Sequence, residues 1–166
     1  TRDAAGHVQK EVVGRFVNGV PTPGFWVLYI FDDAGRILTK KATEPSEQGA
    51  TLYQVTWTYD SRGFVASIVA SDGWTRTYAY DEPGRLVWAS YNNGTYTYEY
   101  HYDAAGNRVR SIEDGVEWEY DVTTGNRLHE VLQDDVPVRT YTYDDNGAVT
   151  FEDRDVDRTY TYDARE

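Results

Sequence analysis

A tyrosine-aspartate pair recurs along this chain, and its repetition constrains the fold more than any other feature of the sequence. Successive Asp positions lie 18 to 29 residues apart. Repetition at about 20 residues is typical of repeat proteins, in which each copy forms one small structural unit. A degenerate copy, YIFDDAGR, lies at 29–36, and a shorter one, RDAAG, at 2–6. The regular copies are VTWTYDSRG (55–63), TYAYDEPGR (77–85), EYHYDAAGN (99–107), WEYDVTTG (118–125), TYTYDDNG (140–147) and TYTYDARE (159–166).

The segment 95–115 shows how one copy folds. Four Tyr residues, at every second position from 96 to 102, alternate with Thr, Glu and His. This period of two places the rings on one face of a strand. Asp103 is followed three residues later by Gly106, which is typical of a tight turn, because Asp caps backbone N–H groups and Gly accepts a positive φ. Asp114-Gly115 predicts a type I′ hairpin turn at the end of the return strand.

Applied to the whole chain, the pattern predicts an all-β protein: an antiparallel meander of tandem β-hairpins, roughly a dozen strands by turn count, that forms a curled ribbon, partial shell or small barrel. One set of turns is built on Asp and Gly, at Asp60, Gly63, Asp81, Gly84, Asp103, Gly106, Asp121, Gly125, Asp144 and Gly147. The second set is expected at Asn18-Gly19, Asp72-Gly73, Asn93-Gly94, Asp114-Gly115 and Asp134-Asp135.

Two of the Asp turns depart from the common spacing. The turn from Asp121 to Gly125 has one extra residue, which predicts a longer loop. Pro83 disfavours the third place of a type I turn, so we expect a shifted frame with Pro83-Gly84 at the centre of a type II turn. Residues 1–50 are expected to hold diverged repeats with a loop or linker at 40–50, and to serve as an N-terminal cap. Residues 51–166 then hold the regular repeats of the same continuous domain.

The segments TYAYDEPGRL (77–86), YHYDAAGNRV (100–109) and, in its second half, FDDAGRIL (31–38) resemble the YD-repeat family, also called Rhs repeats. The resemblance implies a long β-ribbon that spirals into a shell or barrel. In bacterial Rhs proteins and Tc-toxin components such a shell encloses a toxin domain, and wall-associated proteins and teneurins carry similar repeats. It therefore implies a secreted or cell-surface scaffold beside a toxin, an adhesin or another protein partner.

In this family, catalysis belongs to attached segments, and the self-cleaving segment carries a P-x-x-x-x-D-P-x-G signature that this sequence lacks. The chain begins without Met and ends inside a repeat, so we expect a fragment, a processed product or a short relative of a longer repeat protein. Its open sheet edges predict self-association.

Composition excludes several classes of function. The chain has no Cys, which excludes disulfides, thiol nucleophiles and thiolate metal sites. Its net charge of −12 argues against nucleic acid, whose phosphates need a basic surface, and against an anionic membrane surface. The longest apolar run, FWVLYIF at 25–31, is far shorter than the ~20 residues of a membrane span. We therefore expect no nucleic-acid partner and no membrane insertion.

The aromatic rows are the strongest candidates for a binding surface. Packing explains them, because cross-strand aromatic pairs stabilise sheets. A stacking platform for sugar rings is the alternative, with Trp57, Trp74, Trp88 and Trp118 as candidate ligand-stacking residues. The alternative function is therefore a carbohydrate- or protein-binding module.

The titratable residues give no catalytic or metal site. Turn capping explains the repeated Asp better than a calcium ladder does. The run 153–157 mimics the start of an EF-hand, but the required Gly and Glu are missing. His7, His101 and His129 have no metal-ligand spacing. We predict no enzyme activity, no cofactor and no metal. The second alternative to the scaffold function is an enzyme, either a glycosidase or a self-processing protease.

Overall fold

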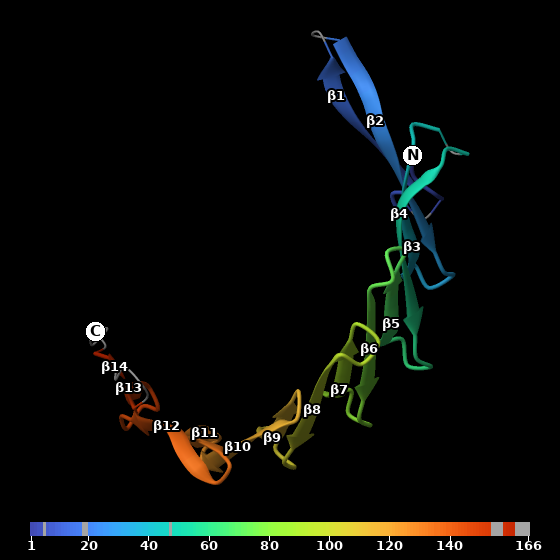
Figure 1. Ribbon diagram of the computed structural model, residues 1–166. Helices are drawn as coiled ribbons and strands as arrows, with labels where there is room; N and C mark the ends of the chain where they lie inside the picture. The colour runs from blue at the N-terminus through green and yellow to red at the C-terminus, as the bar shows by residue number, and fades with distance from the viewer. Residues whose placement is uncertain (5, 18–19, 47, 154–157, 162–166) are drawn as a thin grey trace. The chain divides into compact units, whose positions relative to one another are not determined.

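The computed structural model describes residues 1–4, 6–17, 20–46, 48–153 and 158–161. Fourteen β-strands and no helix are present in these ranges, so they hold no helix long and apolar enough to cross a membrane (Figure 1). The strands are β1 (Lys10–Val17), β2 (Val20–Phe31), β3 (Ile37–Thr43), β4 (Thr51–Tyr59), β5 (Val65–Ala70), β6 (Thr75–Tyr80), β7 (Leu86–Tyr91), β8 (Tyr96–Tyr102), β9 (Arg108–Glu113), β10 (Val116–Thr123), β11 (Arg127–Gln133), β12 (Val136–Tyr143), β13 (Val149–Asp153) and β14 (Arg158–Thr159).

The strands follow one another in chain order in one antiparallel sheet. The predicted all-β antiparallel meander is therefore confirmed. The chain divides into two compact units, of which the first comprises Thr1–Ala79 with Ser90–Thr95 and the second Tyr80–Ala89 with Tyr96–Glu166. Residue 50, where the sequence becomes regular, lies inside the first unit.

The Asp-x-x-Gly turns share one hydrogen-bond pattern. In the turn after β8, Gly106 N donates to Asp103 O at 3.2 Å, and Asp103 N donates to Asn107 O at 2.9 Å. Gly106 has a φ of 92°, which only Gly adopts without strain. The expected frame shift at Pro83 is wrong: Gly84 N donates to the Asp81 carbonyl at 3.1 Å, so this turn keeps the common frame.

The second set of turns is more varied than the sequence suggests. Asp114-Gly115 and Asp134-Asp135 have positive φ at both central residues, as a type I′ turn requires. At Asp72-Gly73 only Gly73 has a positive φ, and Gly73 N bonds Ala70 O, so this turn resembles the Asp-x-x-Gly type. After β7 the expected pair Asn93-Gly94 lies at the centre of a turn in which Thr95 N donates to Asn92 O, and an overlapping turn centred on Asn92-Asn93 precedes it, with Gly94 N donating to Tyr91 O.

The structure corrects the expected positions of the Asp121 turn and of the loop at 40–50. Asp121 lies inside β10, paired with Glu130 of β11, and the turn comes later, at residues 124–126. The expected loop at 40–50 begins only after Thr43, which ends β3 and is fully buried. The Thr43 hydroxyl donates to the carbonyls of Glu44 and Ser46 and so orders the loop. The expected Asn18-Gly19 turn lies outside the described residues.

Few side chains are fully enclosed. The buried apolar residues among those described are Val27, Ala70, Ala89 and Val131. An antiparallel sheet normally buries one face against another layer. No helix or second sheet is present in the described ranges to cover either face, so apolar and aromatic side chains remain partly open.

Candidate functional site

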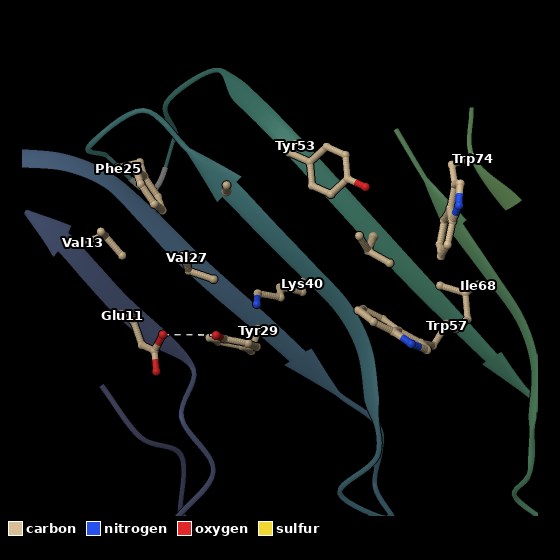
Figure 2. A pocket seen from close by; sticks show the side chains of 12 residues that line it. Glu11, Val13, Phe25, Val27, Tyr29, Lys40, Tyr53, Trp57, Ile68 and Trp74 are labelled. Carbon is tan, nitrogen blue, oxygen red and sulfur yellow. Dashed lines mark hydrogen bonds between the residues drawn. The ribbon is translucent and has the colours of Figure 1, made fainter. Parts of the chain in front are cut away.

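The first unit carries a groove of about 650 Å³ on one face of strands β1 to β5 (Figure 2). Ligand sites of small molecules usually measure about 300–1,000 Å³ and are lined mainly by apolar and aromatic side chains. The groove fits this description in both size and lining.

Strand register builds the apolar floor of the groove. Val13 of β1 lies opposite Phe25 of β2, and Val27 of β2 lies opposite Ala42 of β3. Because side chains alternate between the faces of a strand, residues two apart in one strand share the groove face. Val27 is only 7% exposed, so the floor is closed at its centre.

Aromatic side chains form the wall on the side of β4 and β5. Trp57 of β4 lies opposite Ile68 of β5, and Trp74 stands just before β6. Tyr53 of β4 is 42% exposed and opens toward solvent. Figure 2 shows Tyr53, Trp57 and Trp74 around the same hollow. Of the four candidate stacking residues, the structure therefore brings together Trp57 and Trp74.

The other two candidate Trp residues lie in the second unit and do not line the groove. Trp88 lies in β7 and is 37% exposed. Trp118 lies in β10 opposite Ser111 of β9 and is half-buried. The sequence did not distinguish the four Trp residues, because residue spacing does not show which aromatic side chains line the same groove.

Polar groups stand at the β1 side of the groove. The Tyr29 hydroxyl donates a hydrogen bond of 3.1 Å to Glu11 Oε2, and Lys40 Nζ lies 5.7 Å from the centre of the Tyr29 ring. Burial raises the pKa of Tyr29, and the neighbouring Glu11 carboxylate raises it further. Sequence reasoning missed Glu11 and Lys40, although the alternation along β1 and β3 places them on the apolar face.

Arg76 of β6 extends the groove face beyond Ile68, its cross-strand partner. Its guanidinium carbon lies 4.3 Å from the centre of the Trp74 ring and 5.0 Å from that of Tyr91. The Nε atom of Arg76 is buried and has no hydrogen-bond partner. The sequence predicted Trp74 as a candidate ligand-stacking residue, and in the structure its ring is in contact with the Arg76 cation.

A recurring contact, here called the tyrosine clamp, joins consecutive repeats. In each clamp an Arg of one repeat lies over the motif Tyr of the next, and that Tyr hydroxyl donates to the carbonyl of the residue after the Arg. The hydroxyl contacts measure 2.7 Å for Tyr59 to Ile37, 2.8 Å for Tyr102 to Leu86 and 2.6 Å for Tyr143 to Leu128. The cations are Arg36, Arg85 and Arg127, whose guanidinium carbons lie 4.5, 4.6 and 5.7 Å from the ring centres.

The motif Asp residues hold the turns. Asp32 accepts hydrogen bonds from the backbone and from the side chain of Arg36, and Asp103 accepts both kinds from Asn107. These bonds keep the pKa of both carboxyls below its ordinary value. Asp60, Asp81 and Asp144 likewise accept from the backbone N–H four residues on. These turn carboxylates therefore accept hydrogen bonds that hold the fold together.

Two groups of carboxylates lie elsewhere in the second unit. Asp121, His129 and Glu130 place one ligand atom each within 4.8 Å of one another, and all are partly or fully open to solvent. The β-bulge at Asp121 makes His129 the extra residue of β11, which the sequence spacing did not reveal. A separate hollow of about 200 Å³ is lined by four carboxylates, those of Glu117, Glu119, Asp134 and Asp135.

The fold is similar to that of large crystallised chains. On the crystal structure of TcdB2-TccC3-Cdc42 the TM-score is 0.65 at 17% sequence identity, covering 98% of this chain and 10% of that one. On TcdB2-TccC3 the TM-score is 0.62 at 17% identity, covering 93% and 10%. On TcdB2-TccC3 without its hypervariable C-terminal region it is 0.65 at 16% identity, covering 98% and 10%.

The chain thus spans about a tenth of the length of these chains. At such low identity the likeness shows a shared fold. The sequence matches no protein-family model, and no curated protein matches it significantly.

Proposed function

We propose that this chain is part of a structural scaffold, in which tandem repeats form a shell or stalk around or beside a toxin or adhesin domain of a secreted or cell-surface protein. The tyrosine clamp is the observation that carries the proposal. In this contact the motif Tyr, the Arg and the apolar residue after it join one repeat to the next. The repeated motif therefore has a structural role.

The shared fold supports the same role. Nearly the whole of this chain aligns with about a tenth of the TcdB2-TccC3-Cdc42 chain, which is far longer. A scaffold needs no catalytic group of its own. The motif Asp residues at positions 32, 60, 81, 103 and 144 are engaged in turns, which favours a non-enzymatic role.

The sugar-stacking alternative has weaker support. Several rings of the aromatic rows that a sugar would otherwise cover are in contact with a guanidinium group, from Arg36, Arg76, Arg85 and Arg127. The acidic hollow, where a glycosidase would place its carboxylates, has no aromatic side chain among its described lining residues. Neither alternative explains why the same Arg-Tyr contact is repeated.

The natural reading frame and its product test the proposal. We expect the frame to continue into further repeats and into a toxin or adhesin domain. In limited proteolysis of the full natural protein, that domain should be cleaved more slowly than the same domain expressed alone. Equal cleavage rates, or a frame without such a domain, would refute the scaffold role. The protein should be recovered from the medium or be accessible to protease on intact cells.

A further inference from the structure

The groove face of the first unit carries two cationic side chains in a strongly acidic protein. Lys40 lines the groove, and Arg76 stands beside it, against Trp74. Neither forms an ion pair with any residue that the structure describes. Glu11 is the one carboxylate among the described lining residues, and it accepts the hydroxyl of Tyr29. The groove face is thus cationic, although the chain has a net charge of −12.

The surroundings of the Arg76 side chain independently indicate an anionic ligand. Its Nε atom is buried without a hydrogen-bond partner, which is costly for a charged group. Two aromatic rings hold the guanidinium in place, so its position does not depend on a carboxylate of this chain. An anionic group bound beside Trp74 would compensate this charge.

The remaining lining calls for an apolar ligand body. Between the two cations lie Val55, Trp57 and Ile68 on adjoining strands. Apolar surface left open to water is unfavourable by roughly 25 cal/mol per Å², so a ligand that covers it gains affinity. The volume of about 650 Å³ suits one small molecule.

We propose that this groove binds a small anionic amphiphile, a molecule with one carboxylate or sulfonate group on an aliphatic or aromatic body. Arg76 pairs with the acidic group, Lys40 adds a more distant attraction from the other side of the apolar lining, and the Val, Ile and Trp side chains cover the body. This site lies on the first unit alone and does not depend on the scaffold role. A neutral sugar would leave both cations without a counter-charge, and a cationic amphiphile would be repelled by them.

Fluorescence titration tests the proposal on the 166-residue chain. The probe is 8-anilinonaphthalene-1-sulfonate, displaced by sodium dodecanoate below its micelle concentration. We expect saturable binding at one site and displacement by dodecanoate. Dodecyltrimethylammonium, which has the same tail and the opposite charge, should displace the probe at least roughly tenfold less well, because its head group cannot accept a charge-assisted hydrogen bond from Arg76.

Matched variants assign the site. Arg76→Met and Lys40→Met keep an apolar stem and remove the charge. Arg76→Met should weaken dodecanoate binding several-fold, and Lys40→Met, which removes the more distant charge, should weaken it less. Lys41→Met is the control, because Lys41 is the next residue of β3 and its side chain alternates to the opposite face. Trp57→Ala should weaken binding as well, and Trp57→Phe replaces it if the Ala variant loses its β-sheet circular dichroism.

Three results would overturn the proposal. The first is displacement by dodecyltrimethylammonium at the same concentration as by dodecanoate. The second is equal weakening by Lys41→Met and Arg76→Met in folded protein. The third is probe binding that does not saturate, or that is unchanged in every variant, because it would show general adsorption to the open sheet.

Discussion

The hydroxyl of Tyr102 donates a hydrogen bond of 2.8 Å to the main-chain oxygen of Leu86, and the guanidinium of Arg85 lies over the same ring. Tyr102 directly precedes the motif Asp of one repeat, and Arg85-Leu86 follows the motif Gly of the previous one. One side chain of the repeated motif therefore joins two consecutive hairpins.

Removing this hydroxyl should lower stability. For Tyr102→Phe we expect the free energy of unfolding to fall by about 0.5–1.5 kcal/mol, the usual net value of one hydrogen bond, because the Leu86 carbonyl loses its side-chain donor. Urea unfolding followed by circular dichroism measures the change. Tyr96→Phe is the matched control, since the Tyr96 ring is 47% exposed and lies on the same strand. Equal effects of the two substitutions would show that the clamp contributes nothing specific.

The cation of the clamp should be coupled to its ring. In a double-mutant cycle of Arg85→Met and Tyr102→Leu, we expect a coupling free energy of about 0.5–1 kcal/mol, the range for a cation–π contact near the surface. Arg85 also bonds Asp81 and the Asp103 carbonyl, so its single substitution should cost more than the coupling alone. Strict additivity of the two substitutions would contradict the clamp.

The turn glycines should differ in their tolerance of a side chain. Gly106 has a φ of 92° and nothing within 4 Å of an added Cβ, so Gly106→Ala should cost roughly 1–2 kcal/mol from backbone strain alone. Gly147 has a similar φ of 85°, but an added Cβ would lie 2.8 Å from Arg127 Nη2, an atom of the clamp of that repeat. Gly147→Ala should therefore have the lower melting temperature of the two. The reverse order would show that Arg127 moves away without cost.

The repeat and the hairpins are predictable from sequence because both signals are local. Alternation along residues 96–102 specifies a strand, and Asp103 with Gly106 specifies its turn. The clamp is not predictable in this way, because the partners Tyr102 and Leu86 are 16 residues apart and meet only through the pairing of strands.

The errors arise where one local rule competes with another. Pro83 favoured a shifted turn, yet Asp81 accepts the backbone N–H and the side chain of Arg85 and keeps the common frame. Asp121 matched the motif, but β10 extends past it to Thr123. The groove escaped prediction because Glu11, Lys40 and Trp74 come from three different elements, and only strand register brings them to one face.

Acid should destabilise the repeats through their turn carboxylates. The pKa of Asp32 is lowered first by the bond from the Arg36 backbone, and that of Asp103 first by the Asn107 side chain. A carboxyl whose folded pKa lies below its unfolded value binds fewer protons when folded, so stability rises with pH across this window. The contribution is complete above the unfolded pKa of about 3.9, and it disappears as the pH falls through the lower folded pKa.

Thermal unfolding between pH 2 and pH 7 measures this effect, and we expect the melting temperature to fall steeply below about pH 4, the ordinary pKa of an Asp carboxyl. Asp103→Asn removes one of the responsible carboxyls, so its melting temperature should depend less on pH than that of the unchanged protein. Asp33→Asn, at an exposed neighbour of Asp32, serves as the control and should leave the slope unchanged. A slope altered equally by both variants would assign the acid response to net charge rather than to the turns.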